Sequence, residues 1–377
     1  MLRSNKWLLV LAGVAAGLVA AELVQRVAAP QVYRRPPVWE HDPELGWRHI
    51  PGASGWLESP EFEVEYRINS KGLRDRELPA EQVAGGRRVL CFGDSFVEGW
   101  GVAPAQRVSD LMEEELPGAE VVNFGVAGYG TDQEWLLYEK HGQAWRPDWV
   151  VLFFYGNDLW NNAARQGIGA ERGYKPYFGL DSAGRLQLAG VPVKKAAFWD
   201  AGAAPWTWRL NAYVQQRVHL WALLRKTLAP EVPAQQQERY YQGLYGPAAA
   251  QSGGPWELTG RLLQAFAQSV ESRGGRFLLV YVPALVQIEG DDWKMKRELH
   301  GLVGDYDLKA PQRQLRRLAE QHRIAFLDLD TAFAEEAQSR TLYFRDSHWN
   351  PAGHALAART VAARLRAEDE AMARGAR

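Results

Sequence analysis

The chain has 377 residues, 46% of them hydrophobic, which is enough for one main domain with additions around a substantial core. Its 44 basic side chains nearly balance its 45 acidic ones, which excludes a general attraction to nucleic acid. The single cysteine, Cys91, excludes an internal disulfide framework. Because Cys91 lies in an apolar run, we interpret it as a small buried side chain.

The N-terminus carries a 15-residue apolar run, residues 7–21, which basic residues precede and which Glu22 and Arg26 interrupt. This length lies between the apolar region of a signal peptide and a membrane-spanning helix of about 20 residues. We assign residues 1–29 to a signal anchor or a signal peptide. The anchor is favoured because only a passable cleavage site follows, at residues 27–29; a buried helix is the alternative. An anchor predicts contact with the membrane and places the main domain outside the cytoplasm, in the periplasm or at the cell surface.

The pattern beyond the anchor changes twice. Residues 30–85 are rich in Pro, Gly and Trp and contain short alternating stretches, which predicts a small β-rich lead-in. From residue 86 to about 370, apolar strands alternate with amphipathic helices, which predicts an α/β domain with a parallel sheet. Its five predicted strands are residues 88–92, 120–124, 149–155, 276–282 and 324–329.

Two helices in this domain have recognisable starts. Thr131 and Glu134 have the spacing of a capping box after the second strand. Near the C-terminus, Asn350 is a suitable N-cap and Pro351 suits a first helical turn. We therefore expect one helix to begin at about residue 131 and the last helix at about residue 351.

A segment of about a hundred residues, 160–257, interrupts the alternation of strands and helices and is rich in tryptophan. We expect an insertion over the active site, with a helix at about residues 208–226 and a flexible Gly, Pro and Ala stretch at residues 246–255. Its indoles are suited to stacking on sugars or lining an acyl pocket. They are equally suited to filling a second small core.

Polar or glycine residues follow three of the predicted strands. Ser95 follows the first strand, three glycines that include Gly125 and Gly128 follow the second, and Asn157 follows the third. Because the carboxyl ends of parallel strands meet at one edge of the sheet, we expect these groups to lie close together. The glycine spacing is not that of a dinucleotide-binding or phosphate-binding loop, so no cofactor is predicted.

A further motif, Asp346-Ser347-His348-Trp349, lies just before the last helix. Acyl transfer requires a hydroxyl nucleophile, an imidazole that takes its proton, a carboxylate that orients the imidazole, and donors for the oxyanion. The motif supplies an imidazole and a carboxylate, and the strand ends supply a hydroxyl and candidate donors. Asp346, His348 and His354 are also possible metal ligands, but no zinc motif supports that reading and no metal is predicted.

In this combination the sequence resembles the SGNH/GDSL hydrolase family, whose four blocks occur in order across residues 93–354. The resemblance implies a three-layer, flavodoxin-like, doubly wound parallel sheet with Ser95 as nucleophile. It also implies an oxyanion hole made of the Ser95 and Gly128 amides and the Asn157 side chain. Gly125 is the alternative glycine.

The same resemblance makes His348 the general base and Asp346 its partner. The commonest last block of the family is Asp-x-x-His, whereas this chain has Asp346-Ser347-His348, and Arg345 occupies the position three before the histidine. The Asp-x-His-Trp form is similar to the branch that includes the alginate O-acetylation proteins. His354 is a second candidate base, disfavoured because a helix N-terminus opposes its positive charge.

We therefore expect a serine esterase that cleaves small-molecule or carbohydrate esters through a covalent acyl-enzyme. Two alternatives stay open at this point. One is an O-acyltransferase that modifies a cell-surface polysaccharide. The other is a non-catalytic glycan-binding or scaffold protein on the same fold.

Overall fold

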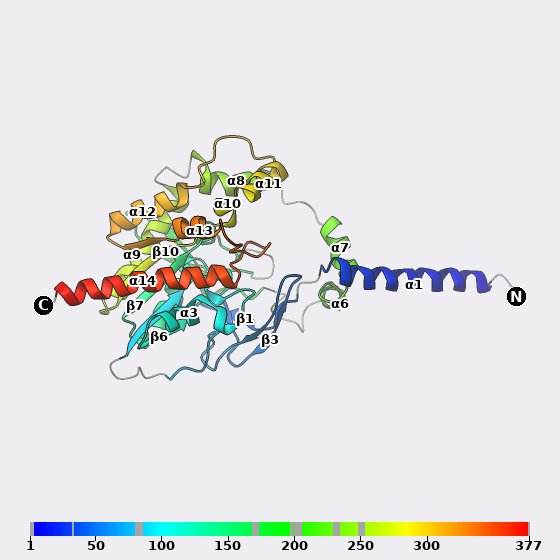
Figure 1. Cartoon of the computed structure of the whole chain (residues 1–377), viewed down its shortest axis with the longest axis horizontal. Helices are drawn as coiled ribbons and strands as arrows, with labels where there is room; N and C mark the ends of the chain where they lie inside the picture. The colour runs from blue at the N-terminus through cyan, green and yellow to red at the C-terminus, as the bar shows by residue number, and fades with distance from the viewer. Residues whose placement is uncertain are drawn as a thin grey trace.

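The computed structural model describes residues 4–31, 34–79, 86–167, 173–196, 199, 206–228, 234–247 and 253–375. Its centre is a five-stranded parallel sheet with the strand order β11-β10-β7-β5-β6 (Figure 1). The five predicted strands are confirmed to within two residues at each end. They are β5 (Arg87–Phe92), β6 (Ala119–Asn123), β7 (Trp149–Phe154), β10 (Arg276–Tyr281) and β11 (Ala325–Asp328).

Helices cover both faces of the sheet, as the predicted three-layer, doubly wound architecture requires. Alternate residues of β5 enter opposite cores: Leu90 and Phe92 pack in one, Val89 and Cys91 in the other. This explains why the strands are continuously apolar. The first face is covered by α4 (Thr131–Leu137), α9 (Gly254–Glu271) and α12 (Ala310–His322), and the second by α3 (Val108–Glu115), α13 (Asp330–Glu336) and α14 (Pro351–Gly375).

The two predicted helix starts have different outcomes. The Asn350 carboxamide oxygen accepts the Ala352 and Gly353 amides at 2.9 and 3.1 Å, so the predicted cap of α14 is confirmed. The predicted capping box of α4 is wrong, because Gly130 is the N-cap residue and Thr131 is already helical. The Asp132 amide of the first turn donates instead to the Asn162 carboxamide oxygen, on the next helix α5 (Asp158–Ala163).

The residues before the sheet form two antiparallel hairpins, as the alternating pattern predicts. They pair β1 (Trp39–Asp42) with β2 (Gly46–His49), and β3 (Ser54–Glu58) with β4 (Glu63–Arg67). Trp100, which follows the short helix α2 (Ser95–Glu98), packs in the small core of these hairpins. The hairpins are therefore built onto the loop that follows the first sheet strand.

The Trp-rich segment contains a hairpin of β8 (Tyr177–Leu180) and β9 (Leu186–Ala189), followed by α6 (Trp206–Gln215), α7 (His219–Leu228) and α8 (Ala234–Tyr245). The single helix predicted at residues 208–226 is wrong, because the chain turns between α6 and α7, where the Arg217 and Val218 amides both donate to the Val214 carbonyl. Much of the predicted flexible stretch, residues 248–252, lies outside the described residues. Two further helices, α10 (Leu285–Ile288) and α11 (Gly290–His300), follow β10.

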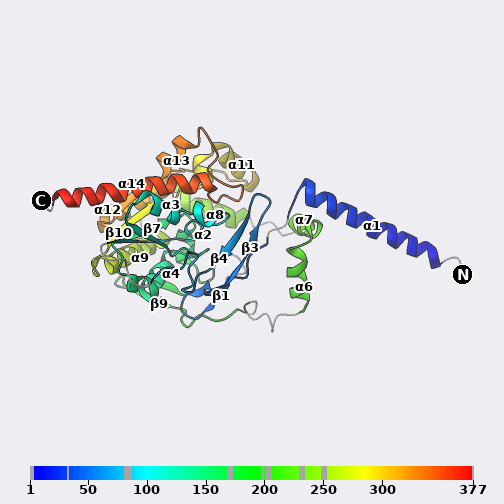
Figure 2. The ribbon, with the colours of Figure 1, turned by 60° about the horizontal axis from the view of Figure 1, so that its bottom comes forward.

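The N-terminal helix α1 (Ser4–Ala28) projects away from the rest of the molecule (Figure 2). The most apolar 18-residue stretch within Lys6–Ala28 has a mean hydropathy of 2.2, and none of this stretch is buried. In the part of the chain that the structure describes, this is the one helix long and apolar enough to cross a membrane. Both a membrane anchor and a signal sequence have this character.

Candidate active site

The three strands at the centre of the site are neighbours in the sheet, with β5 between β7 and β6. Their carboxyl ends therefore place Ser95, Asn157 and the Gly125–Gly130 loop at one edge of the sheet. Ser95 is the first residue of α2, directly after a tight turn at Gly93. A Cβ atom on Gly93 would lie 2.5 Å from the Val97 Cγ2 atom, so the turn has no room for a side chain.

The structure brings Ser95 and His348 into contact although 253 residues separate them in sequence. The Ser95 Oγ atom lies 2.9 Å from the His348 Nε2 atom, a hydrogen-bond distance. Both side chains are partly exposed, so the pair is open to solvent on one side. This is the geometry in which an imidazole takes the proton of an attacking hydroxyl.

His348 is held by a tight turn that explains the short Asp-x-His spacing. The Phe344 amide donates to the His348 carbonyl at 2.8 Å, and the Ser347 amide donates to the Phe344 carbonyl at 3.0 Å. Ser347 has a φ of 73°, a left-handed conformation that is unfavourable for a residue with a side chain. This conformation folds the turn so that Asp346 and His348, on either side of Ser347, come together.

Asp346 contacts both the histidine and a tryptophan. Its Oδ1 atom lies 3.2 Å from His348 Nδ1, an ion-pair distance, although the geometry is not that of an aligned hydrogen bond. Its Oδ2 atom accepts a 3.0 Å hydrogen bond from the Trp100 indole. Burial opposes ionisation of Asp346, but the contacts with His348 and the hydrogen bond from Trp100 hold its pKa below the usual value. Asp346 is therefore placed as an anion beside the imidazole.

Aromatic rings fix the orientation of the imidazole. The Trp100 ring stacks on His348 with a centroid distance of 5.4 Å and an interplanar angle of 28°. Phe96 packs beside the imidazole at the same centroid distance. Trp349 is fully buried and stacks on Phe333 of α13, so it anchors the turn that carries His348 in the core.

Asn157 lies next to the turn that carries Ser95. Its Nδ2 atom donates a 2.9 Å hydrogen bond to Asp94 Oδ2, which leaves the second Nδ2–H available for another acceptor. Burial raises the pKa of Asp94, against hydrogen bonds from the Phe96 amide and Asn157 that favour the anion. Asp94 thus orients the Asn157 carboxamide from behind.

The structure distinguishes the two candidate oxyanion glycines. The Gly125 amide donates to the Asn123 carboxamide oxygen at 2.9 Å, and a Cβ on Gly125 would lie 2.2 Å from the Glu98 nitrogen. Gly125 is therefore a packing residue with an occupied amide. Within the described part of the chain, neither the Ser95 amide nor the Gly128 amide donates to another group. Gly128 is partly exposed and has a φ of 80°.

A cluster of buried carboxyl groups lies close to the nucleophile turn. Glu134 and Asp158 are fully buried, and burial together with the neighbouring carboxyls, Asp94 among them, raises the pKa of both well above the ordinary values. Neither carboxylate oxygen of Glu134 has a hydrogen-bond partner among the described residues. These raised pKa values favour the neutral, protonated form of the two buried carboxyl groups.

The β3–β4 hairpin contacts the turn that carries His348 directly. The Glu61 carboxylate accepts the Arg345 amide at 3.0 and 3.2 Å, and Phe62 packs on Phe344 with ring centroids 4.9 Å apart. These contacts position the turn that carries His348.

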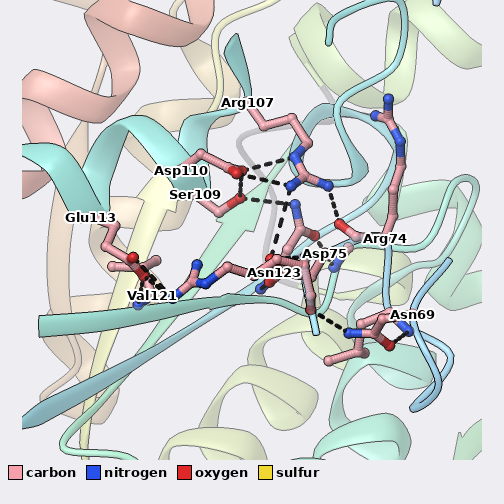
Figure 3. Close-up of polar contacts among 12 residues, drawn as sticks. Asn69, Arg74, Asp75, Arg107, Ser109, Asp110, Glu113, Val121 and Asn123 are labelled. Atoms are coloured by element: carbon pink, nitrogen blue, oxygen red, sulfur yellow. Dashed lines mark hydrogen bonds and ion pairs between the residues drawn. The ribbon is translucent and has the colours of Figure 1, made fainter. Parts of the chain in front are cut away.

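A polar network ties the end of the lead-in to the loop after the nucleophile helix (Figure 3). The buried Arg74 guanidinium donates to the carbonyls of Glu98, Gly99 and Val102. Figure 3 shows Arg107 between Arg74 and Asp110: it donates to the Arg74 carbonyl and to both Asp110 carboxylate oxygens. The network fixes the backbone after α2, and with it Trp100.

Asn123, at the end of β6, belongs to the same network. Its carboxamide donates to the Val97 carbonyl and to the Ser109 hydroxyl, at 2.7 and 3.0 Å. Its backbone amide donates to Asp75, whose pKa is raised to about 6 by burial. Asn123 thus supports the nucleophile helix from the neighbouring strand.

His354, the second candidate base, lies away from the nucleophile. It is buried, its Nδ1 atom accepts the Val108 amide at 3.2 Å, and burial lowers its pKa to about 3. It is a structural link between α14 and α3. Among the residues that the structure describes, no three His, Cys, Asp or Glu side chains form a group suited to a metal ion.

Three contributors were not recognised from the sequence: Trp100, Asp94 and Glu61. Trp100 and Glu61 act through contacts with residues more than 240 positions away, which no local pattern reveals. Asp94 lies inside the Gly-Asp-Ser motif, so its position next to Ser95 in the sequence could have indicated that it contributes to the site.

Comparison with known proteins identifies the family of the chain. The family model described as "GDSL-like Lipase/Acylhydrolase family" matches residues 91–356. No curated protein sequence matches the chain.

Solved structures similar to the chain include two acetylxylan esterases and a protein named TesA. The acetyl xylan esterase AlAXEase is 18% identical with a TM-score of 0.37, covering 73% of this chain and 97% of its own. A catalytic mutant of Axe2, an acetylxylan esterase from Geobacillus stearothermophilus, is 15% identical with a TM-score of 0.39, covering 74% and 94%. TesA is 13% identical with a TM-score of 0.37, covering 73% and 96%.

Proposed function

Because this chain belongs to the GDSL-like lipase/acylhydrolase family, we propose that it is a serine-dependent ester hydrolase with Ser95, His348 and Asp346 as its catalytic triad. The observation that carries the proposal is the 2.9 Å contact between Ser95 Oγ and His348 Nε2. The ionised Asp346 on the other side of the imidazole supports the same assignment, because a carboxylate there stabilises the imidazolium that forms.

The proposed reaction has two steps. In the first, His348 Nε2 takes the Ser95 proton as Oγ attacks the ester carbonyl, and the collapsing tetrahedral intermediate expels the alcohol, which receives that proton. In the second, His348 activates water, which attacks the acyl-serine and releases the carboxylic acid and free Ser95. In both steps the carbonyl oxygen becomes negative. The donors we assign to it are the Ser95 and Gly128 amides and the free Nδ2–H of Asn157.

An O-acyltransferase is the second candidate, and the Asp346-x-His348-Trp349 spacing favours it. It differs from the hydrolase only in the second step, where an acceptor hydroxyl replaces water. In either case we propose that α1 anchors the chain and that the catalytic domain lies outside the cytoplasm, where cell-surface carbohydrate esters are available as substrates.

The test is hydrolysis of a panel of short-chain aryl esters and acetylated oligosaccharides by the full-length protein in detergent. We expect turnover that Ser95→Ala abolishes. Asn157→Ala should lose on the order of a hundredfold in kcat, about 3 kcal/mol, with an unchanged melting temperature. Near-normal turnover of Asn157→Ala contradicts the oxyanion assignment. Transfer of the acyl group to an added glycan, faster than release to water, identifies the transferase.

A further inference from the structure

The helices α6 and α7 expose apolar stripes. In α6 the exposed residues Trp206, Leu210 and Tyr213 are spaced by four and three positions, which places them on one helix face. In α7 the exposed residues Trp221, Leu224 and Leu228 are spaced by three and four positions. Trp206 and Leu228 are each 73% exposed. Large apolar side chains gathered in this way mark a surface that contacts something other than water.

The second observation is how α7 meets the N-terminal helix. The Glu22 carboxylate accepts the backbone amides of His219 and Leu220, the first two residues of α7, at 3.0 and 2.8 Å. The Arg26 guanidinium donates to the Arg217 carbonyl at 2.9 Å. The two charged residues that end the apolar run of α1 are thus bonded to the start of α7. These contacts hold the start of α7 beside the point where the apolar run of α1 ends.

The apolar surface is continuous across this junction. A groove of about 600 Å³ runs between the two elements, lined by Leu18, Val19 and Leu23 of α1 and by Trp221 and Leu224 of α7. Figure 2 shows α6 running across the direction of α1, between that helix and the sheet. If α1 crosses a bilayer, α6 and α7 therefore lie at its surface.

Basic residues occupy a neighbouring face of α7. Arg225 and Lys226 line a cavity of about 730 Å³ together with Arg345 and Asp346 of the catalytic turn. One face of α7 thus adjoins the apolar groove, and another lies beside the active site. Apolar and aromatic side chains flanked by lysine and arginine are the pattern of a helix that lies in the membrane interface.

We propose that α6 and α7 form a second membrane-binding element, whose apolar stripes enter the boundary between headgroups and acyl chains of an anionic bilayer. The element holds the catalytic turn close to the membrane surface, so ester substrates that are themselves attached to the membrane reach the active site. The inference rests on the proposed anchoring by α1. It does not depend on the identity of the ester.

The experiment measures the membrane depth of single spin labels on the full-length chain, reconstituted in vesicles of phosphatidylethanolamine and phosphatidylglycerol. Labels are attached to Leu210→Cys and Leu224→Cys. Native Cys91 is buried, so we expect it to react little with the spin label. The parent chain, treated with the same reagent, measures this background labelling. Leu11→Cys in α1 reports whether the anchor inserts. Leu299→Cys is the matched control, because Leu299 in α11 is an equally apolar residue, 68% exposed.

For each label we compare relaxation by oxygen, which concentrates in the bilayer, with relaxation by a water-soluble nickel chelate. Labels at positions 210 and 224 should have an oxygen-to-nickel ratio below that at position 11, which lies inside the bilayer, and at least threefold above that at position 299. Replacing Arg225 and Lys226 by glutamate should lower the ratio at position 224 at least twofold in the anionic vesicles.

Three results overturn the inference. Ratios at positions 210 and 224 that equal the ratio at position 299, with position 11 in the bilayer, show that only the anchor binds lipid. Protection of both labels from oxygen and nickel shows that a protein surface covers the stripes instead. A label at position 11 that is exposed to water contradicts both the anchoring by α1 and the membrane-binding element. Ester hydrolysis, measured on the same samples, tests the proposed enzymatic activity separately from these results.

Discussion

Replacing Trp100 with phenylalanine removes one hydrogen bond from the proposed catalytic carboxylate while an aromatic ring stays in place. The indole donates to Asp346 Oδ2 at 3.0 Å and stacks on the His348 ring. A hydrogen bond to a charged group contributes about 1.5–3 kcal/mol. At about 1.4 kcal/mol per factor of ten, its loss should lower kcat roughly 10- to 100-fold.

The assay is steady-state hydrolysis of an aryl ester, with kcat and KM determined separately. We expect kcat to fall and KM to change less than threefold, because Trp100 acts on the base and not on substrate binding. Trp56→Phe is the matched control: it makes the same change in the β3–β4 hairpin, at a residue 48% exposed. A Trp100→Phe enzyme within twofold of wild-type kcat, with the fold intact, refutes the assignment of Trp100 as a positioning residue.

Three further predictions concern Ser347, Glu134 and Glu61. Because the Ser347 φ of 73° suits glycine, Ser347→Gly should raise the free energy of unfolding by about 1 kcal/mol and retain activity. Ser347→Val should lower both the free energy of unfolding and the activity. Chemical denaturation measures the free energies. The pKa of Glu134 in the folded protein is raised above its ordinary value of 4.5, so its buried neutral form contributes stability at low pH. This stability is lost as the pH rises above 4.5, by up to about 1.4 kcal/mol per pH unit. Glu134→Gln should therefore have a higher melting temperature than wild type at pH 8, and a smaller gain at pH 5. Glu61→Ala should lower kcat several-fold, because the Arg345 amide loses its acceptor, whereas Glu63→Ala, on the same hairpin, should not.

The sheet was predictable because its strands are buried on both faces and are therefore continuously apolar, as in Val150 to Phe153. The grouping of Ser95 and Asn157 followed from the rule that the carboxyl ends of parallel strands share an edge. What the sequence did not reveal depends on contacts between distant segments. The break between α6 and α7 is one case, because the amides that begin α7 donate to Glu22, 197 and 198 positions away.

The capping box failed for a similar reason. Thr131 and Glu134 have the correct spacing, but Glu134 is fully buried among other carboxyls and Asn162 accepts the Asp132 amide of the first turn. A local motif predicts local bonding only where tertiary packing leaves its side chains free. The role of Trp100 is hidden for the complementary reason, since its partner Asp346 lies 246 positions away.

The central claim, that Ser95 is a nucleophile activated by His348, is tested most directly by labelling with a fluorophosphonate and mapping the adduct by mass spectrometry. We predict a single adduct on Ser95, absent in Ser95→Ala and formed at least a hundredfold more slowly in His348→Gln. An adduct on another residue, or undiminished labelling of the Ser95→Ala protein, would contradict the account.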